Sequence, residues 1–406
     1  MPIKFPISQT IHILNIHPRL LDPLEQKAIN IITTIEQSQA DSIWMKLISC
    51  VLLDPSLISM LWPETCEKNQ NLIPTIRQIK QKSWNPKAEE SLTINKNQWL
   101  AENGDPNNSN GLIYSLLNDL QSTDLTAGDS FQNLSRYYIW RDLIVVHLAA
   151  PELAYLQLKI FQLLYMQATQ WGKPYAAGYA YQGYERIGIA GAKPTQQRLQ
   201  KYEFLPWLKP HMHVLEIGCN NGFMALEIAR HVDHVKAIEF NPYLVEIGRI
   251  TSAEFQQKNV HFEVADFPIW ETNEQYDIVI SFANHCTIDG NLSMDFEDYI
   301  AKIWKITKHD GYFLFETHNV FGPGTGKPGD DGDLDKKFDI VECYFEYIDS
   351  KMTQRFIPKY DIDKLFVILR KRDKIIIKPQ RKMDLNTAKK RFNFSENPFP
   401  STDSEK

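Results

Sequence analysis

The sequence VLEIGCNNG, residues 214–222, decides the fold of this chain. An apolar run that contains Glu216 ends at Gly218, and a second glycine, Gly222, follows after three further residues. Glycine lets the backbone turn tightly and approach a ligand without a Cβ collision, and asparagine between the glycines tolerates a left-handed backbone. Apolar residues then recur at helical spacing from Met224 onward. The stretch therefore predicts a strand, a nucleotide-binding turn and a helix whose first N–H groups face that turn.

Composition limits the class of protein. The chain has 406 residues, of which 43% are hydrophobic, so it can bury a sizeable core and we expect two domains. A formal net charge of -6 argues against generic polyanion binding by the whole molecule. The five cysteines form no CxxC pair, which favours a reducing cytoplasm over secretion or a zinc cluster. Charged residues and Pro151 interrupt the most apolar stretch, residues 137–166, so we expect no membrane span.

Residues 1–174 are predicted to form an all-helical N-terminal domain. Apolar residues recur every three or four positions in residues 24–35, 42–61 and 151–168, which is typical of amphipathic helices. This region carries no recognisable catalytic pattern. We therefore expect it to select the substrate or to dock a protein partner.

Strands and helices alternate from His213 onward, which indicates a mostly parallel α/β sheet with helices on both faces. The second strand ends at Glu239, about 20 residues after the turn, where a carboxylate suits hydrogen bonds to ribose hydroxyls. The third strand delivers Asp266 and Phe267, an acceptor and an aromatic ring that suit the amine and the face of an adenine. These residues extend the predicted nucleotide site.

Two further strands end in polar residues that suit an acceptor site. Asn284 and His285 follow one core strand, and Glu316 and His318 follow the next. Open α/β sheets bind ligands at the carboxyl ends of their strands, and histidine titrates near neutrality. His285 is therefore the candidate general base, Asn284 would orient the acceptor, and Glu316 and His318 would line its pocket. With Asp289, the last two would also suit a magnesium-like ion, but the carboxylates are too few and we expect no metal.

A segment rich in tyrosine and glycine precedes the first strand and carries three cations, Arg186, Lys193 and Arg198. Glycines allow close backbone approach, so this segment either closes over a cofactor or grips an anionic substrate. The alternative is an inter-domain linker whose tyrosines pack on the core.

The pattern Glu216-x-Gly218-x-x-x-Gly222, followed by Glu239, Asp266 and Asn284-His285, resembles the class I S-adenosylmethionine-dependent methyltransferases. The resemblance implies a Rossmann-like, seven-stranded, mostly parallel sheet with an antiparallel last strand, in a methyltransferase domain at residues 175–372. Its closing strands would be residues 338–347 and 365–369. The implied cofactor is S-adenosylmethionine. With the cation of the preceding segment included, the predicted cofactor-binding residues are Arg186, Glu216, Gly218, Cys219, Asn220, Gly222, Glu239, Asp266 and Phe267.

A nicotinamide enzyme is the alternative within the same fold class. Its dinucleotide-binding turn needs G-x-G-x-x-G, whereas Gly218 and Gly222 have no second glycine between them. The spacing therefore favours methyl transfer.

Residues 373–406 are predicted to be a basic, disordered tail. Between Lys364 and Arg391 lie eleven basic residues and two acids, on a chain that is acidic overall. Such a segment either contacts RNA or is solvated, and a solvated segment is the commoner outcome. The glycine-rich residues 322–329 are either a mobile lid or a solvated loop.

The sequence thus predicts a cytoplasmic S-adenosylmethionine-dependent methyltransferase that acts on an oxygen of a small molecule or saccharide. The reasons are the candidate base beside the donor site and the lack of zinc thiolates or a strong nucleic-acid signature. An RNA methyltransferase that uses the basic segment is the enzymatic alternative. A catalytically silent, cofactor-binding partner protein is the non-enzymatic one.

Overall fold

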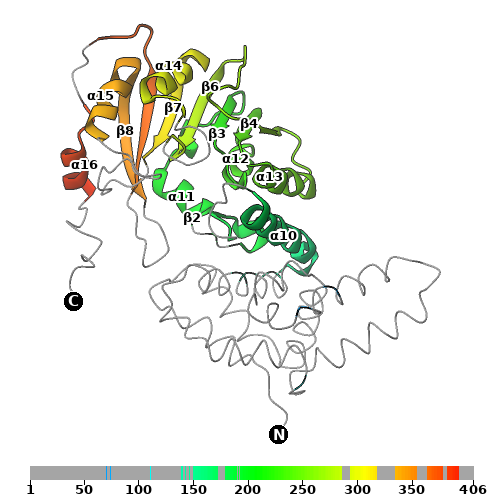
Figure 1. Ribbon diagram of the computed structural model, residues 1–406. Coiled ribbons are helices and arrows are strands. Elements are labelled where there is room, and N and C mark those ends of the chain that lie inside the picture. Colours follow the sequence, from blue (N-terminus) through cyan, green and yellow to red (C-terminus); the bar gives the residue numbers. More distant parts are fainter. Residues whose placement is uncertain are drawn as a thin grey trace, which may run out of the picture. The chain divides into compact units, whose positions relative to one another are not determined.

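The computed structural model describes residues 150–171, 179–189, 191, 193–285, 293–317, 334–353, 364–377 and 382–392, with isolated positions at 70, 74, 110, 139, 142 and 146 (Figure 1). The chain divides into two compact units. The first comprises Met1–Ala180 and Glu185–Ala190, and the second comprises Tyr181–Tyr184 and Gly191–Lys406. The division falls near the predicted boundary at residue 175, although the chain returns once to the first unit. The helices predicted at 24–35 and 42–61 lie outside the described residues.

The first unit contains the helix predicted at residues 151–168. A 3-10 turn, η2 (Pro151–Leu153), leads into α10 (Ala154–Gln170). Gln157 is buried on α10, and its Nε2 donates to the carbonyl oxygens of Asp142 and Ile187, both at 3.0 Å. These bonds tie the 3-10 helix η4 (Glu185–Ile187) to α10 within this unit.

The described part of the second unit contains a seven-stranded sheet in the order β5-β4-β3-β6-β7-β9-β8. Neighbouring strands from β5 to β7 are parallel, and β9 runs antiparallel to both β7 and β8. The prediction of a seven-stranded sheet with an antiparallel last strand is therefore confirmed. The strands are β3 (His213–Ile217), β4 (His234–Glu239), β5 (Val260–Val264), β6 (Tyr276–Phe282), β7 (Thr307–Glu316), β8 (Phe345–Thr353) and β9 (Lys364–Lys371).

Helices cover both faces of this sheet (Figure 1). Glu216 pairs with Ala237, which pairs with Phe262, so these three side chains share one face. That face carries α11 (Thr195–Tyr202), α12 (Phe223–Ile228) and α13 (Pro242–Glu254). Leu215 and Ile217 point to the opposite face, where they join a buried apolar cluster with residues of α14 (Phe296–Ile306) and α15 (Leu334–Tyr344).

A short parallel pair, β1 (Gln182–Gly183) and β2 (Lys193–Pro194), precedes α11. Gly191 has a φ of +67°, and a Cβ built on it would lie 2.1 Å from the backbone nitrogen of Gly183. Only glycine fits this close approach of two backbones. The pair brings Gln182 and Lys193 to the sheet, close to the start of α11.

The strand predicted at residues 338–347 is wrong for its first part. Leu334–Tyr344 form α15, because Leu334, Phe338 and Val341 recur at helical spacing and bury one face. The strand begins only at Phe345.

The prediction of a disordered tail at residues 373–406 is also wrong in part. Leu385–Phe392 form α16, and Met383 and Ala388 are buried in the same apolar cluster as α15. The Glu342 carboxylate accepts hydrogen bonds from the backbone N–H of Lys382 at 2.8 and 2.9 Å and from that of Met383 at 2.7 Å. This carboxylate therefore anchors the approach to α16. Residues 393–406 lie outside the described residues.

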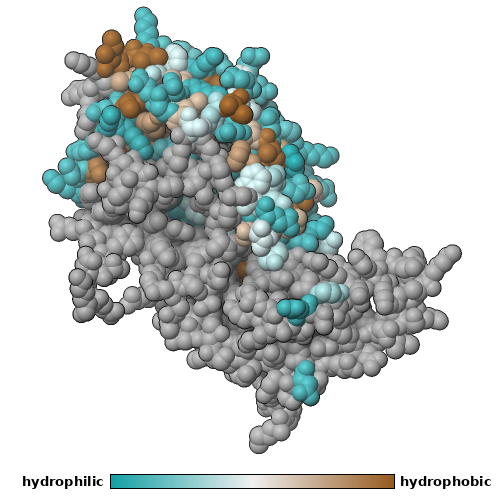
Figure 2. All heavy atoms as spheres, in the orientation of Figure 1, coloured by the Kyte–Doolittle hydropathy of each residue, from teal (hydrophilic) through white to brown (hydrophobic). Residues whose placement is uncertain are grey.

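The surface of the second unit is mixed in character. On the face shown in Figure 2, brown apolar residues lie as separate spots among teal hydrophilic ones. Ile269 and Ile377 are strongly exposed. No helix in the described ranges is long and apolar enough to cross a membrane.

Candidate functional site

The turn between β3 and α12 requires its glycines. Gly218 and Gly222 have φ values of +67° and +76°, a left-handed backbone that side chains rarely adopt. A Cβ on Gly218 would lie 2.3 Å from Oδ1 of Asn284, and one on Gly222 would lie 2.3 Å from the ring of Phe262. Asn220 is also left-handed, at +51°, as the sequence predicts for an asparagine in this turn. The turn therefore presents bare backbone at the carboxyl end of β3.

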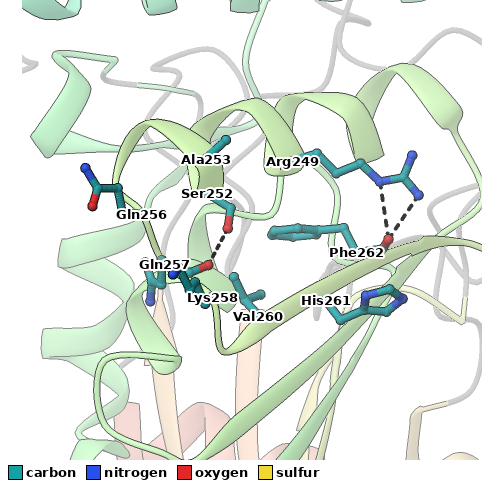
Figure 3. Close-up of a pocket in the computed structure, with 9 residues that line it drawn as sticks. All are labelled: Arg249, Ser252, Ala253, Gln256, Gln257, Lys258, Val260, His261 and Phe262. Carbon is teal, nitrogen blue, oxygen red and sulfur yellow. Dashed lines mark hydrogen bonds between the residues drawn. The ribbon is translucent and has the colours of Figure 1, made fainter.

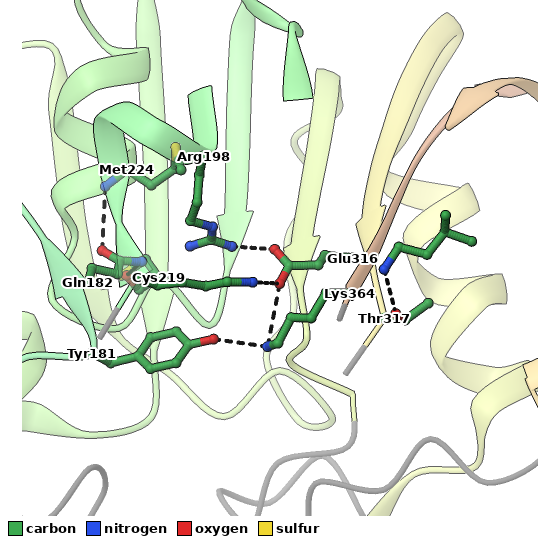
Figure 4. Close-up of polar contacts among 10 residues, drawn as sticks. Tyr181, Gln182, Arg198, Cys219, Met224, Glu316, Thr317 and Lys364 are labelled. Carbon is green, nitrogen blue, oxygen red and sulfur yellow. Dashed lines mark hydrogen bonds and ion pairs between the residues drawn. The ribbon is translucent and has the colours of Figure 1, made fainter. Parts of the chain in front are cut away.

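Gln182 closes the turn from β1, and the sequence-based prediction missed it. Its Oε1 accepts hydrogen bonds from the N–H groups of Phe223 and Met224 at 3.0 and 3.4 Å, and its Nε2 donates to the carbonyl oxygen of Cys219 at 3.1 Å (Figure 4). It thus caps two of the free N–H groups at the start of α12. The signal in the sequence was its place in the tyrosine-rich segment before the first strand.

Glu239 is tied to the turn through the main chain. Its Oε2 accepts from the N–H of Asn220 at 2.9 Å, and its Oε1 accepts from the N–H of Asn241 at 3.0 Å. Asn241 caps α13 by accepting from the N–H groups of Tyr243 and Leu244. Glu239 therefore lies beside the turn at the end of β4, where a ribose contact was predicted.

Glu216 and Asn221 are buried at the turn with unsatisfied polar atoms. Oε2 of Glu216 and both amide atoms of Asn221 have no hydrogen-bond partner among the described residues. Burial raises the pKa of Glu216 to about 8, an effect that the Glu239 carboxylate increases and Arg198 opposes. Buried polar groups in proteins are normally satisfied, so these atoms fit a polar ligand at the turn.

Asp266 and Phe267 follow β5, and the two side chains lie in different surroundings. Asp266 is half-buried, and its carbonyl oxygen accepts from the N–H groups of Ile269 and Trp270 in a turn. The ring of Phe267 is buried, edge-on to Tyr299 at a centroid distance of 5.2 Å. Asp266 keeps a position that suits an adenine contact, whereas Phe267 packs in the core, and both adenine contacts stay predictions.

Asn284 and His285 lie together past the end of β6. The Asn284 side chain packs against Gly218, so it adjoins the glycine turn. The His285 ring is 7% exposed and lies among aromatic rings, with centroids 5.1 Å from Phe296 and 5.2 Å from Phe315. Nζ of Lys337 is 3.2 Å from its Nε2. Because an ammonium can only donate, a hydrogen bond between these two atoms requires Nε2 as the acceptor.

Glu316 at the end of β7 is completely buried among cations. Nζ of Lys193 lies 2.8 Å from its Oε1 and Nζ of Lys364 lies 3.4 Å from the same atom, while the guanidinium of Arg198 bonds its Oε2 (Figure 4). The sequence predicted this residue as part of an acceptor pocket but gave no hint of these partners. A carboxylate held in this way is unsuited to ligating a metal ion.

Arg186 belongs to a different unit from the other described residues of the predicted site. Arg186 is exposed on η4, in the first unit, while the other cations of its segment, Lys193 and Arg198, converge on Glu316. His318 and Asp289 lie outside the described residues. Within the described ranges, no group of three or more His, Cys, Asp or Glu side chains is arranged to hold a metal ion.

A hollow of about 420 Å³ opens elsewhere on the second unit (Figure 3). Its lining comes from the last turns of α13 and the first residues of β5, including Arg249, whose guanidinium donates to the carbonyl oxygen of Phe262. None of the predicted site residues lines it. Because parallel sheets bind ligands at the carboxyl ends of their strands, this hollow is separate from the site at the glycine turn.

Comparison with known proteins finds a match in this region. Residues 208–353 match the model of a methyltransferase domain. The chain is 33% identical to a demethylmenaquinone methyltransferase of Leptospira interrogans over 109 residues, which are 26% of this chain and 42% of that protein. It is 30% identical to a malonyl-[acyl-carrier protein] O-methyltransferase of Acetivibrio thermocellus over 111 residues, 27% of this chain and 36% of that protein. The chain thus spans less than half the length of these curated relatives.

Among solved structures, the N-methyltransferase NodS of Bradyrhizobium japonicum aligns with 53% of this chain and 100% of its own, at 16% identity and a TM-score of 0.38. The domain match confirms the resemblance to methyltransferases for residues 208–353. That segment contains the glycine turn, Glu239, Asp266, His285 and Glu316.

Proposed function

We propose that this chain is an S-adenosylmethionine-dependent methyltransferase. The observation that carries the proposal is the turn from Gly218 to Gly222, which lies inside the matched methyltransferase domain and is bonded through Asn220 to the Glu239 carboxylate. Bare backbone at the turn admits a nucleoside thioether closely, and the carboxylate beside it suits ribose hydroxyls. The unsatisfied atoms of Glu216 and Asn221 support a polar ligand at the same place.

S-adenosylmethionine, when bound, supplies an activated methyl group, so the protein has mainly to align an acceptor in line with it. We propose an oxygen of a small molecule or saccharide as the acceptor. His285 would take the hydroxyl proton, and Asn284, which touches Gly218, would orient the acceptor beside the donor. Nε2 of His285 lies 3.2 Å from Nζ of Lys337, so the acceptor hydroxyl would have to displace this contact to reach the lone pair.

The proposed base and acceptor class rest on the positions of His285 and Asn284 beside the glycine turn. A hydroxyl acceptor needs a base, whereas a carboxylate or an amine lone pair does not, so the base is tied to the acceptor class. We propose that the N-terminal unit selects the acceptor or docks a partner, and that the protein works in the cytoplasm.

Calorimetric titration with S-adenosylhomocysteine and S-adenosylmethionine, with NAD as the negative control, tests the donor site. We expect both sulfur compounds to bind the intact chain, and Glu239→Ala and Asp266→Ala to weaken both by about tenfold or more, since each removes a predicted nucleoside contact. Tyr276→Phe, at the amino end of β6, is the matched control. Binding of NAD alone would point to the nicotinamide alternative instead.

Methyl transfer from labelled donor to fractionated cell extract then tests the activity. Once an acceptor is known, His285→Ala should lower kcat by about a hundredfold or more without weakening the binding of S-adenosylhomocysteine. An unchanged kcat would remove His285 from the mechanism. Donor binding without transfer to any fraction would favour the catalytically silent partner protein.

A further inference from the structure

The buried cations around Glu316 outnumber the acids that face them. Lys193, Arg198 and Lys364 are 0–2% exposed and share the single carboxylate of Glu316. Among the described residues, three cations against one carboxylate leave an excess of two positive charges. Tyr181 accepts a hydrogen bond from Lys364 at 2.9 Å and adds no carboxylate. A buried charge without a counterion costs several kcal/mol, so an excess of this kind is unusual in a purely structural ion pair.

The carboxyl of Glu216 does not remove the excess. Arg198 acts on the Glu216 carboxyl, but burial raises the pKa of that group to about 8, so it is mostly protonated at neutral pH. Burial also lowers the pKa of Lys193 well below its usual value, against the opposing effect of Glu316. Even with a neutral Lys193, Arg198 and Lys364 still outnumber Glu316. Positive charge therefore remains among the described residues of the cluster in either protonation state.

The helix that supplies Arg198 presents unused polar groups on the same side. Thr195, Arg198 and Tyr202 lie three and four residues apart on α11, so they share one helical face. Oγ1 of Thr195 and Nε of Arg198 have no hydrogen-bond partner among the described residues. Burial and the neighbouring Glu316 carboxylate raise the pKa of the Tyr202 hydroxyl, so this hydroxyl lies beside that carboxylate. All three side chains are at least 99% buried.

This face adjoins the donor turn. The Arg198 guanidinium lies 4.8 Å from the centroid of the Phe282 ring, at the end of β6. Asn284 follows two residues later and packs against Gly218. Phe282 pairs with Glu316, so the carboxyl ends of β6 and β7 lie side by side under α11. One small molecule could therefore contact both this helical face and the glycine turn.

We propose that the cluster of Thr195, Arg198 and Tyr202 with Lys193 is a carboxylate-binding site of the methyltransferase. The proposal rests on the proposed function. A carboxylate would supply the missing negative charge and accept the free N–H of Arg198 and the two hydroxyls. The carboxylate comes either from the amino-acid end of the donor or from an acidic acceptor, and the chemistry of recognition is the same for both.

The test uses the full-length chain and three conservative variants, Thr195→Val, Tyr202→Phe and Arg198→Lys. The first two each remove one hydroxyl, so the fold should be unaffected. Tyr276→Phe is again the matched control, because its hydroxyl bonds Glu274 at the amino end of the sheet. Each protein is titrated with S-adenosylhomocysteine and with its decarboxylated analogue, which lacks only the carboxylate. Malonate is then titrated into the protein saturated with S-adenosylhomocysteine.

If the donor supplies the carboxylate, all three variants should bind S-adenosylhomocysteine about tenfold less tightly and bind the analogue as the wild type does. If the acceptor supplies it, the binding of S-adenosylhomocysteine stays unchanged, and malonate binds all three variants about tenfold less tightly than it binds the wild type. Either pattern supports the site.

Variants that alter neither ligand, with S-adenosylhomocysteine still binding, would overturn the carboxylate site and leave the proposed function intact. Conversely, malonate binding to the ligand-free chain that is lost in the variants, with no binding of either nucleoside, would support the anion site and contradict the proposed function. The two failures are therefore distinguishable.

Discussion

At the scale of single residues, three glutamates of the sheet differ in the groups that surround their carboxylates. Glu239 accepts main-chain N–H groups, Glu316 is surrounded by cations, and Glu216 is buried with one oxygen unsatisfied. Each lies at or next to the last residue of a β-strand, and the sequence alone makes them look alike. Their partners, which come from distant parts of the chain, set their charge.

The buried carboxyl of Glu216 should make the protein less stable as the pH rises. Its folded-state pKa of about 8 lies above the ordinary value, so the unfolded chain releases this proton first and stability falls between about pH 4.5 and about pH 8. Glu216→Gln, which stays neutral, should match the wild type near the acid end of this range. At about pH 8 it should be more stable by on the order of 3 kcal/mol. Urea unfolding of both proteins at several pH values measures this, and parallel pH profiles would show that Glu216 ionises freely.

The first glycine of the turn, Gly218, should not tolerate a methyl group. Gly218→Ala places a Cβ against Asn284 on a left-handed backbone, which costs about 1–3 kcal/mol of strain. We expect lower stability and weaker S-adenosylhomocysteine binding together, because the displaced Asn284 borders the turn. Thermal unfolding and calorimetry on the same sample measure both effects, and wild-type affinity in this variant would exclude a ligand at the turn.

At the scale of secondary-structure elements, Glu316 joins three segments. Lys193 belongs to β2, Arg198 to α11 and Lys364 to β9, and all three converge on the end of β7. Burial opposes ionisation, but the charges of Arg198, Lys193 and Lys364 hold the pKa of Glu316 well below its usual range. Its contribution to stability is thus present above the ordinary carboxyl pKa and is lost only in stronger acid, as the pH falls through the lowered value.

Removal of this carboxylate should therefore be costly. Glu316→Gln leaves the buried cations uncompensated, and we expect a loss of about 3–5 kcal/mol in the free energy of unfolding. Glu346→Gln is the matched control, because Glu346 forms a solvent-exposed pair with Arg370 at 2.6 Å and should cost less than about 1 kcal/mol. Urea unfolding at neutral pH measures both losses. Equal losses would mean that the cations around Glu316 do not depend on its negative charge.

Helix α16 should contribute to the stability of the core. Truncation before Lys382 removes the buried Met383 and Ala388 and the N–H groups that satisfy Glu342, so we expect a decrease in Tm of about 4 °C or more. Truncation after Phe392 keeps these groups and is the control. Differential scanning calorimetry of the two truncated chains measures the difference, and equal Tm values would show that α16 adds nothing.

At the scale of the whole molecule, four of the described basic residues near the C-terminus have partners within the fold. Lys364 is buried, Arg370 pairs with Glu346, Arg372 donates to main-chain carbonyl oxygens, and Arg391 pairs with Asp349. On a chain with a net charge of -6, we expect no saturable binding of single-stranded RNA at about 0.15 M salt. Fluorescence anisotropy with a labelled oligoribonucleotide measures this. Salt-sensitive RNA binding that is lost on truncation after Arg372 would restore the RNA methyltransferase as a candidate.

The sequence by itself determined the glycine turn, the succession of strands along the chain and the acids at their ends, because these depend on local spacing. Glycine at 218 and 222, a cap at Asn241 and apolar runs of strand length act within a few residues. It misassigned residues 338–344 and 385–392, whose helices are stabilised by burial against other elements.

Only the tertiary structure decided what surrounds each acid. Lys193 and Glu316 are 123 residues apart in sequence, and Gln182 reaches the start of α12 from 41 residues away. No local pattern encodes such pairs, because they form only when the sheet brings its strand ends together under α11. The charge excess and the free polar groups of that helix follow from packing, and they carry the carboxylate site that the spacing of residues could not reveal.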